Sequence, residues 1–267
     1  MANHQSRKIA FVLASSDHGT MIVNRFDYHM VDANRGFGVG FDLLSTSTFD
    51  PAGVEMTTGL LRLRRHHFGD GVTAIDCGAN IGVFTVEWAR AMTGWGNVIA
   101  IEAQERVFYA LAGNIAVNNC FNARAIFAAA SDQAGMMKAP QLDHTRPASF
   151  GSVEIKRREH TEFAGQAIDY DAPDASEIPC MTLDSLGLAR VDLIKIDVEG
   201  MEMNVLAGAA ALIEGHRPVM VVEHIKTDAE KLRRWLEALD YRVLVSGINF
   251  VAIHNSDPGL ASIQVKG

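Results

Sequence analysis

The stretch Ala74-Ile75-Asp76-Cys77-Gly78-Ala79-Asn80-Ile81-Gly82 constrains the fold of this 267-residue chain more than any other part. It begins as a short apolar run and ends in a glycine-rich turn. An amphipathic segment that starts at Val83 follows it. This order predicts the strand, loop and helix of a nucleotide-binding α/β half-fold, in which glycines let the backbone turn sharply and approach a ligand. The free N–H groups at the start of the helix suit polar or anionic groups.

A second apolar run, Val98-Ile99-Ala100-Ile101, ends in Glu102. An acidic residue about 20 residues past the glycines stands where nucleotide-binding folds hold ribose hydroxyls. We therefore interpret Gly78, Gly82 and Glu102 together as a cofactor site. The alternative for the two glycines is a purely structural role in tight strand–helix packing.

The spacing of the loop distinguishes between cofactors. It reads Asp76-x-Gly78-x-Asn80-x-Gly82 rather than G-x-G-x-x-G. This pattern resembles motif I of class I S-adenosylmethionine (SAM) methyltransferases. The resemblance implies that the loop packs against the methionine part of SAM, and that Glu102, beside Ala103, binds ribose. An NAD(P)-dependent oxidoreductase is the alternative, but Asn80 at the middle position counts against it.

Apolar runs and helical patterns alternate from Thr73 onward. They predict strands near 73–77, 98–102, 124–128, 193–196 and 218–224, with helices over 105–118, 202–214 and 229–239. Residues 241–245 and 249–253 read as a closing hairpin. The order is similar to the Rossmann-like fold of class I methyltransferases. We expect an α/β fold with a seven-stranded, mostly parallel sheet and a C-terminal antiparallel hairpin.

Two further segments complete the predicted organisation. Residues 1–70 form an N-terminal extension with a hairpin and a helix, and residues 71–267 form the SAM-binding domain. Within that domain, glycines and prolines mark residues 133–180 as an insertion, with short strands over 136–139 and 152–156. We expect such an insertion at the ligand edge to shape the substrate site.

Ser131 and Asp132 follow the third predicted strand. A carboxylate just past a parallel strand lies at the ligand edge of the sheet. The methyltransferase resemblance implies that Asp132, beside Ser131, accepts the amino group of adenine. The alternative is an aspartate that only caps a turn or helix.

The second informative stretch is Leu193-Ile194-Lys195-Ile196-Asp197-Val198-Glu199-Gly200-Met201-Glu202. With the glycine loop and the Thr182–Leu186 segment, it resembles the FkbM family of SAM-dependent methyltransferases. The resemblance covers about residues 72–225. It implies O-methylation of a hydroxyl on a sugar, a glycan or a natural product. A protein that binds SAM without catalysis is a further alternative.

An alcohol acceptor must lose a proton, so we looked for bases at the ligand edge. Asp197 follows the fourth parallel strand and is expected to face the acceptor or the methionine end of SAM. Glu199 and His224 are the other candidates. Glu199 is equally consistent with a helix cap, and His224 with a structural histidine at a strand end. Acidic residues are frequent in the loops, but none has clear metal-ligand spacing, so we predict no metal site.

Bulk composition excludes several classes of partner. The net charge is −8 and the isoelectric point about 5.7, which disfavours binding to nucleic acid. No apolar run approaches the ~18 residues of a membrane span. Three cysteines, an odd number without paired spacing, indicate reduced thiols and a cytoplasmic location. The expected partner is a small-molecule or glycan acceptor.

Overall fold

The structure is a computed structural model that describes residues 8–33, 35–158, 160–172 and 175–262. Its centre is a seven-stranded sheet in the order β13-β14-β12-β11-β5-β6-β7. Neighbouring strands pair in parallel from β12 to β7, whereas β14 is antiparallel to both β12 and β13. The strands are β5 (Val72–Cys77), β6 (Gly96–Glu102), β7 (Ala123–Phe127), β11 (Leu193–Ile196), β12 (Val219–Glu223), β13 (Tyr241–Ser246) and β14 (Asn249–His254). The predicted sheet and its closing hairpin are confirmed.

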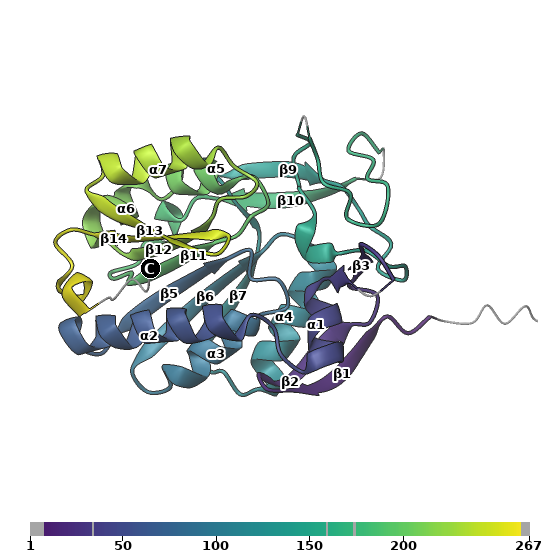
Figure 1. The fold of residues 1–267 in the computed structure, drawn as a ribbon, viewed down its shortest axis with the longest axis horizontal. Coiled ribbons are helices and arrows are strands. Elements are labelled where there is room, and N and C mark those ends of the chain that lie inside the picture. The colour runs from purple at the N-terminus through teal and green to yellow at the C-terminus, as the bar shows by residue number, and fades with distance from the viewer. Residues whose placement is uncertain (1–7, 34, 159, 173–174, 263–267) are drawn as a thin grey trace, which may run out of the picture.

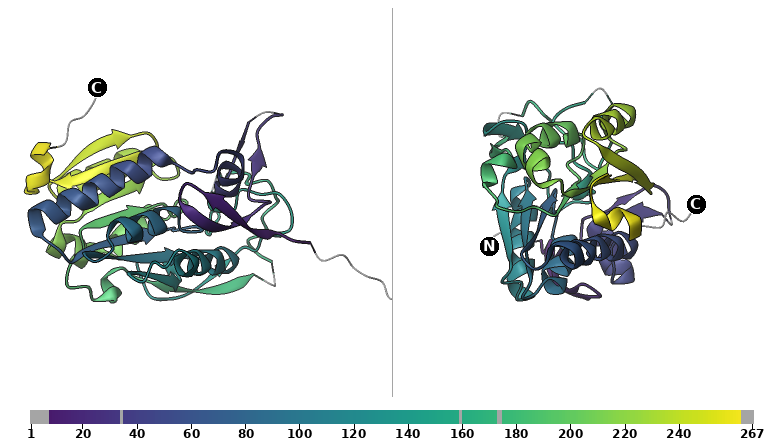
Figure 2. Two further views of the ribbon diagram at one scale, coloured as in Figure 1. Left: turned by 90° about the horizontal axis from the view of Figure 1, so that it is seen from below. Right: turned by 90° about the vertical axis from the view of Figure 1, so that its left-hand side faces the viewer.

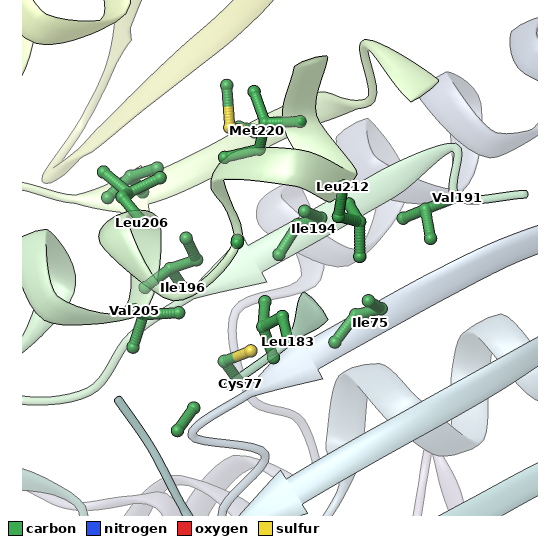
Figure 3. Packing of buried hydrophobic residues seen from close by; sticks show 14 of the residues in the cluster. Ile75, Cys77, Leu183, Val191, Ile194, Ile196, Val205, Leu206, Leu212 and Met220 are labelled. Carbon is green, nitrogen blue, oxygen red and sulfur yellow. The ribbon is translucent and has the colours of Figure 1, made fainter. Parts of the chain in front are cut away.

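Helices cover both faces of this sheet (Figure 1). One face carries α5 (Glu202–Ala207), α6 (Ala210–His216) and α7 (Ala229–Ala238), and the other carries α2 (Pro51–Phe68), α3 (Val83–Ala91) and α4 (Glu105–Val117). Side chains of β5 alternate between the two layers, so Ala74 packs with Leu61 and Trp88. Ile75 instead belongs to the cluster on the opposite face, where it lies near Leu183 and Leu212 (Figure 3). Of the helices in the described ranges, none combines the length and apolar character needed to cross a membrane.

The helix predicted over 202–214 is interrupted in the structure. It divides into α5 and α6, because Asp184 accepts hydrogen bonds from the backbone N–H groups of Ala211 (3.1 Å) and Leu212 (2.8 Å). These bonds satisfy backbone N–H groups in the first turn of α6, which have no acceptor within the helix. Gly208 lies at the break, where an added Cβ would be 2.0 Å from the carbonyl oxygen of Ser131. The interruption therefore fits α5 closely against the chain that leaves β8 (Ala129–Ala130).

An N-terminal hairpin of β1 (Phe11–Ser16) and β2 (Gly19–Asn24) confirms the hairpin predicted there. Figure 2 shows it at the end of the molecule away from the β13–β14 hairpin. Asn114 of α4 and Asn118, which follows this helix directly, hold the hairpin, since the N–H of Ile22 donates to Asn114 (2.6 Å) and the N–H of Thr20 to Asn118 (3.2 Å). Two short strands, β3 (His29–Met30) and β4 (Gly36–Phe37), and helix α1 (Val39–Thr46) lead from this hairpin to α2.

The insertion supplies two strands, β9 and β10, to a small three-stranded sheet in the order β8-β10-β9. Strand β9 (Gly135–Ala139) matches the prediction for residues 136–139, and its partner is β10 (Ser176–Met181). The strand predicted over 152–156 is wrong. The chain there begins with the short helix η1 (Phe150–Ser152), because the N–H of Phe150 donates to the buried side chain of Asp27 (2.9 Å) instead of to a strand. Two more short helices are η2 (Asp184–Leu186) and η3 (Pro258–Ser262).

A buried ion-pair network connects α2 to the residue before β11 and to the segment after β14. Arg64 donates from Nε to Asp192 (3.2 Å) and from Nη1 to Asp257 (2.5 Å). Asp192 also accepts a hydrogen bond from the N–H of Thr73 at 3.0 Å. All three charged side chains are at least nine-tenths buried. Removing one member of such a network is costly, because the remaining charges stay buried without a full set of partners.

We predict that Arg64→Met lowers the free energy of unfolding by about 3 kcal/mol, since it leaves Asp192 and Asp257 with fewer partners. Urea denaturation measures the change. Arg62→Met is the matched control, because Arg62 lies on the exposed side of the same helix, and its effect should stay within about 0.5 kcal/mol. Equal effects of the two substitutions would contradict the assigned role of the network.

Candidate functional site

A cavity of about 400 Å³ lies at the carboxyl ends of the parallel strands. This volume falls in the range of small-molecule sites, and the position is where open α/β sheets bind ligands. Its walls come from the loops after β5, β6, β11 and β12, from the chain after β7, and from two segments outside the sheet. The predicted site residues among them are Gly78, Asn80, Gly82, Glu102, Ala103, Asp197 and Glu199.

The glycine loop is pressed against the end of β11. Gly78 has φ +75°, and an added Cβ would lie 1.7 Å from the carbonyl oxygen of Asp197. Only glycine satisfies both the backbone conformation and this close approach. Asn80 also has a positive φ of 50°, a conformation that asparagine tolerates better than most residues. Both residues line the cavity, so the loop presents its backbone to a ligand.

Glu102 connects the end of β6 to the glycine loop. Its two carboxylate oxygens accept hydrogen bonds from the N–H groups of Asn80 (2.9 Å) and Gln104 (2.8 Å). Burial raises the pKa of Glu102 to about 7, although these hydrogen bonds act in the opposite direction. Because each oxygen retains a lone pair and the residue lines the cavity, Glu102 can accept hydrogen bonds from ligand hydroxyls.

Lys195 places a buried ammonium between two aspartates. Its Nζ lies 2.9 Å from Asp197 and 3.8 Å from Asp76. Burial alone would lower the pKa of Lys195, but the two carboxylates raise it overall. Burial also opposes ionisation of Asp197, yet the charge and hydrogen bond of Lys195 lower the pKa of Asp197. Lys195 and Asp197 both line the cavity.

Asp76 is not among the described residues that line the cavity, so the structure gives no support to its predicted contact with a cofactor, which stays a prediction. It is 1% exposed and lies behind Lys195, where it also accepts a hydrogen bond from Thr85 (2.7 Å). Burial raises the pKa of Asp76, against the lowering effect of Lys195. Its role in the structure is to hold Lys195 and the start of α3.

A second lysine, Lys226, contacts Glu199 and lies 2.8 Å from Glu162. Glu199 has a φ of 56°, which is rare for a glutamate and places strain at the site. Glu223, the last residue of β12, lines the cavity beside them. Burial, together with the negative charge of Asp197, raises the pKa values of Glu199 and Glu223. This end of the cavity therefore concentrates carboxyl groups.

His224 lies next to Glu223 but is not among the described residues that line the cavity. Its ring stacks on Phe250, with centroids 4.3 Å apart, because successive side chains point to opposite sides as the chain leaves β12. The predicted role of His224 as a base is not supported by this position. The neighbouring residue, Glu223, lines the cavity, where the sequence analysis expects the histidine.

Ser131 and Asp132 also lie outside the cavity, whose wall in this region is Ala128, Ala129 and Ala130. The N–H of Ser131 donates to the carbonyl of Met181 (2.8 Å), which continues the pairing of β8 with β10. Asp132 is exposed and accepts a hydrogen bond from Ser131 (3.0 Å). The structure therefore gives no support to the predicted contact of these two residues with adenine, which stays a prediction.

Sequence reasoning missed one wall of the cavity, which comprises Phe37, Gly38, Val39, Asp42 and Phe49. A second wall belongs to the insertion that was expected to shape the substrate site, although none of its residues was named: Ser149, Gly151, Ser152, Val153 and Ile155. Buried Asp27 ties the two walls together, since it accepts hydrogen bonds from the N–H groups of Gly40 (2.8 Å) and Phe150 (2.9 Å). Burial raises the pKa of Asp27 to about 6. No local sequence pattern predicts this contact, because the two segments are more than 100 residues apart in the sequence.

Comparison with known proteins gives a family match. A family model described as "Methyltransferase FkbM domain" matches residues 76–243. This range contains the glycine loop, Glu102, both lysines and the three carboxylates of the strand ends, but not the wall at 37–49. No curated protein sequence matches the chain.

The chain is also similar to solved structures. The methyltransferase FkbM from Methylobacillus flagellatus KT is 16% identical with a TM-score of 0.51, covering 69% of this chain and 44% of its own. This chain thus spans less than half of that protein. A precorrin-6y C5,15-methyltransferase from Geobacter metallireducens GS-15 is 15% identical with a TM-score of 0.42, and the match covers 78% of this chain and 89% of that protein. A Pyrococcus abyssi tRNA (uracil-54, C5)-methyltransferase in complex with S-adenosyl-L-homocysteine is 14% identical with a TM-score of 0.41, and the match covers 91% of this chain and 44% of that protein.

We predict that Gly78→Ala lowers the free energy of unfolding by about 3 kcal/mol or more, because the new methyl group collides with the backbone of Asp197. Gly94→Ala is the control. Gly94 has a similar φ of +82°, but nothing lies within 4 Å of its added Cβ. Chemical denaturation should show a loss of only about 1 kcal/mol for Gly94→Ala. If both variants lose the same stability, the close approach to β11 does not explain the glycine.

Proposed function

The chain belongs to the FkbM methyltransferase family, and from that premise we propose that it transfers a methyl group from SAM to a hydroxyl on a sugar, a glycan or a natural product. The family sets aside the alternative of an NAD(P)-dependent oxidoreductase. The main support for SAM is that one cavity contains both Glu102 and Asp197. These residues come from strands separated by β5 in the sheet.

The lining residues fit an adenosine-containing sulfonium compound. The wall formed by Ile101, Ala103 and Ala128–Ala130 is apolar and suits a purine ring. Glu102 offers acceptors for ribose hydroxyls. Asp197 supplies negative charge for the cationic end of the cofactor. When bound, SAM supplies an activated methyl group, so the protein has mainly to position the two reactants.

The proposed base for the acceptor hydroxyl is Asp197. Lys195 keeps this carboxylate ionised and fixes its orientation through the 2.9 Å hydrogen bond. A fixed carboxylate in the cavity can accept a proton as the oxygen attacks. Glu199 is held by Lys226, so we assign it to binding the acceptor rather than to proton transfer.

Acceptor choice is proposed to depend on the wall at residues 37–49. This wall lies outside the matched domain, and it brings Phe37, Phe49 and Asp42 to the cavity. Aromatic and carboxylate side chains together suit a polyhydroxy ligand with an apolar face. The net charge of −8 makes a nucleic-acid acceptor unfavourable. The proposed acceptor is therefore a small molecule or a glycan.

We predict that Glu102→Gln weakens SAM binding by about 1.5–3 kcal/mol, because the charge-assisted hydrogen bonds to ribose are lost. Asp132→Asn should leave the affinity unchanged, since Asp132 lies outside the cavity. Isothermal titration calorimetry on both folded variants measures the dissociation constants. A larger loss in Asp132→Asn than in Glu102→Gln would restore the sequence-based assignment of Asp132 and would count against the present one.

We predict that Asp197→Asn lowers the rate of methyl transfer by about 10²-fold or more, because its side chain can no longer accept the proton. His224→Phe should retain the rate, since a phenyl ring preserves the stacking on Phe250. The measurement follows isotope-labelled methyl from SAM into acceptors of a cell extract by mass spectrometry. Absence of labelled product with the wild-type protein would instead favour a SAM-binding protein without catalysis.

A further inference from the structure

Three carboxylates lie close together at one end of the cavity, although their spacing in the sequence does not predict a metal site. Asp197 and Glu199 follow β11, and Glu223 ends β12. One oxygen atom from each lies within 4.8 Å of the others. All three residues line the cavity. Oxygen atoms this close can coordinate the same cation.

The pairing of the two strands produces this convergence. Ile196 of β11 is in register with Val222 of β12. The next residues along these parallel strands are Asp197 and Glu223, which therefore emerge side by side at the carboxyl edge. Glu199 reaches the same point through its strained backbone, with φ 56°. A strained residue that turns a third carboxylate toward two others indicates a functional requirement there.

Glu223 gives an independent indication of a ligand. Glu223 is 6% exposed, and Oε2 accepts no hydrogen bond from an N–H or hydroxyl donor of the described residues; its carboxyl group instead faces the carboxyl group of Asp197. The side chain faces the cavity. Leaving a buried carboxylate oxygen unpaired is costly, so such atoms in native proteins usually have a bound ligand, ion or water as a partner.

Acidic groups outnumber basic groups in this part of the described chain. The acids in and directly behind the cavity are Asp76, Asp197, Glu199, Glu202 and Glu223, and the bases are Lys195 and Lys226. These carboxyl groups outnumber the ammonium groups that could pair with them. Glu162, the other partner of Lys226, has a side chain that is 43% exposed and adds further negative charge at the rim.

We propose that Asp197, Glu199 and Glu223 bind a hard divalent cation such as Mg²⁺ or Mn²⁺. Three carboxylate oxygens suit these ions, and the open cavity leaves coordination positions for water or for an acceptor oxygen. Lys195 and Lys226 hold Asp197 and Glu199, in the way that outer hydrogen bonds orient metal-ligating carboxylates. If the proposed function holds, the cation would hold the acceptor hydroxyl beside Asp197 and lower its pKa, and a free lone pair of the Asp197 carboxylate would still accept the proton.

The test is Mn²⁺ binding to the full chain without SAM, followed by the loss of the electron paramagnetic resonance signal of free Mn²⁺. The wild type should bind one ion per chain. Glu223→Gln keeps the shape of the side chain but removes its charge, and should weaken binding by about tenfold or more. Asp132→Asn is the control, because it removes an exposed acid outside the cavity and leaves the three proposed ligands and both lysines intact; its affinity should change by less than about twofold.

Glu199→Gln provides a second variant if Glu223→Gln does not fold, and thermal denaturation monitored by circular dichroism checks each protein. Failure of the wild type to bind Mn²⁺ at millimolar concentration would overturn the proposal. So would equal affinities in the wild type and the folded ligand variants. Because SAM is absent, the result is separate from the proposed function: loss of SAM binding with retained Mn²⁺ binding would contradict only the methyltransferase assignment.

Discussion

The buried ammonium of Lys195 is the interaction on which the candidate site depends. It lies between Asp76 of β5 and Asp197 after β11, two adjacent strands. A charge with this degree of burial is stable only when it is well paired, so the lysine holds both carboxylates in place. The same strand ends bring Gly78 against the backbone of Asp197. Cofactor loop and proposed base thus form one rigid unit, and the other walls are built around it.

Much of this unit could be predicted from the sequence, because local patterns encode it. The apolar run before Gly78 and the one before Asp197 each predicted a buried strand that ends at the ligand edge. Glu102 was identified by its distance from the glycine loop, and it lines the cavity. Asn80 was predicted as part of the cofactor loop and lines the cavity, but the hydrogen bond from its backbone N–H to Glu102 could not be predicted from the motif. The closing hairpin followed from two short apolar runs around Gly247.

The remainder depends on contacts that a single sequence does not display. Glu223 and His224 are adjacent, and only the register of β12 against β11 decides which of them faces the cavity. Asp76 fits the motif but lies behind Lys195. The wall at Phe37–Phe49 reaches the site through the long-range hydrogen bonds of Asp27. The pairing of β10 with β8 leaves Ser131 and Asp132 outside the cavity. In each case packing between distant segments, rather than local propensity, determines the outcome.

A crystal structure of the protein with S-adenosyl-L-homocysteine tests the central claim most directly, because it locates the cofactor without requiring the acceptor. The account predicts that both ribose hydroxyls lie within hydrogen-bond distance of Glu102, about 2.5–3.0 Å. It also predicts that the purine contacts Ala128–Ala130 and that the sulfur lies on the side of Asp197. A nucleoside bound outside this cavity, or a ribose with no contact to Glu102, would contradict it.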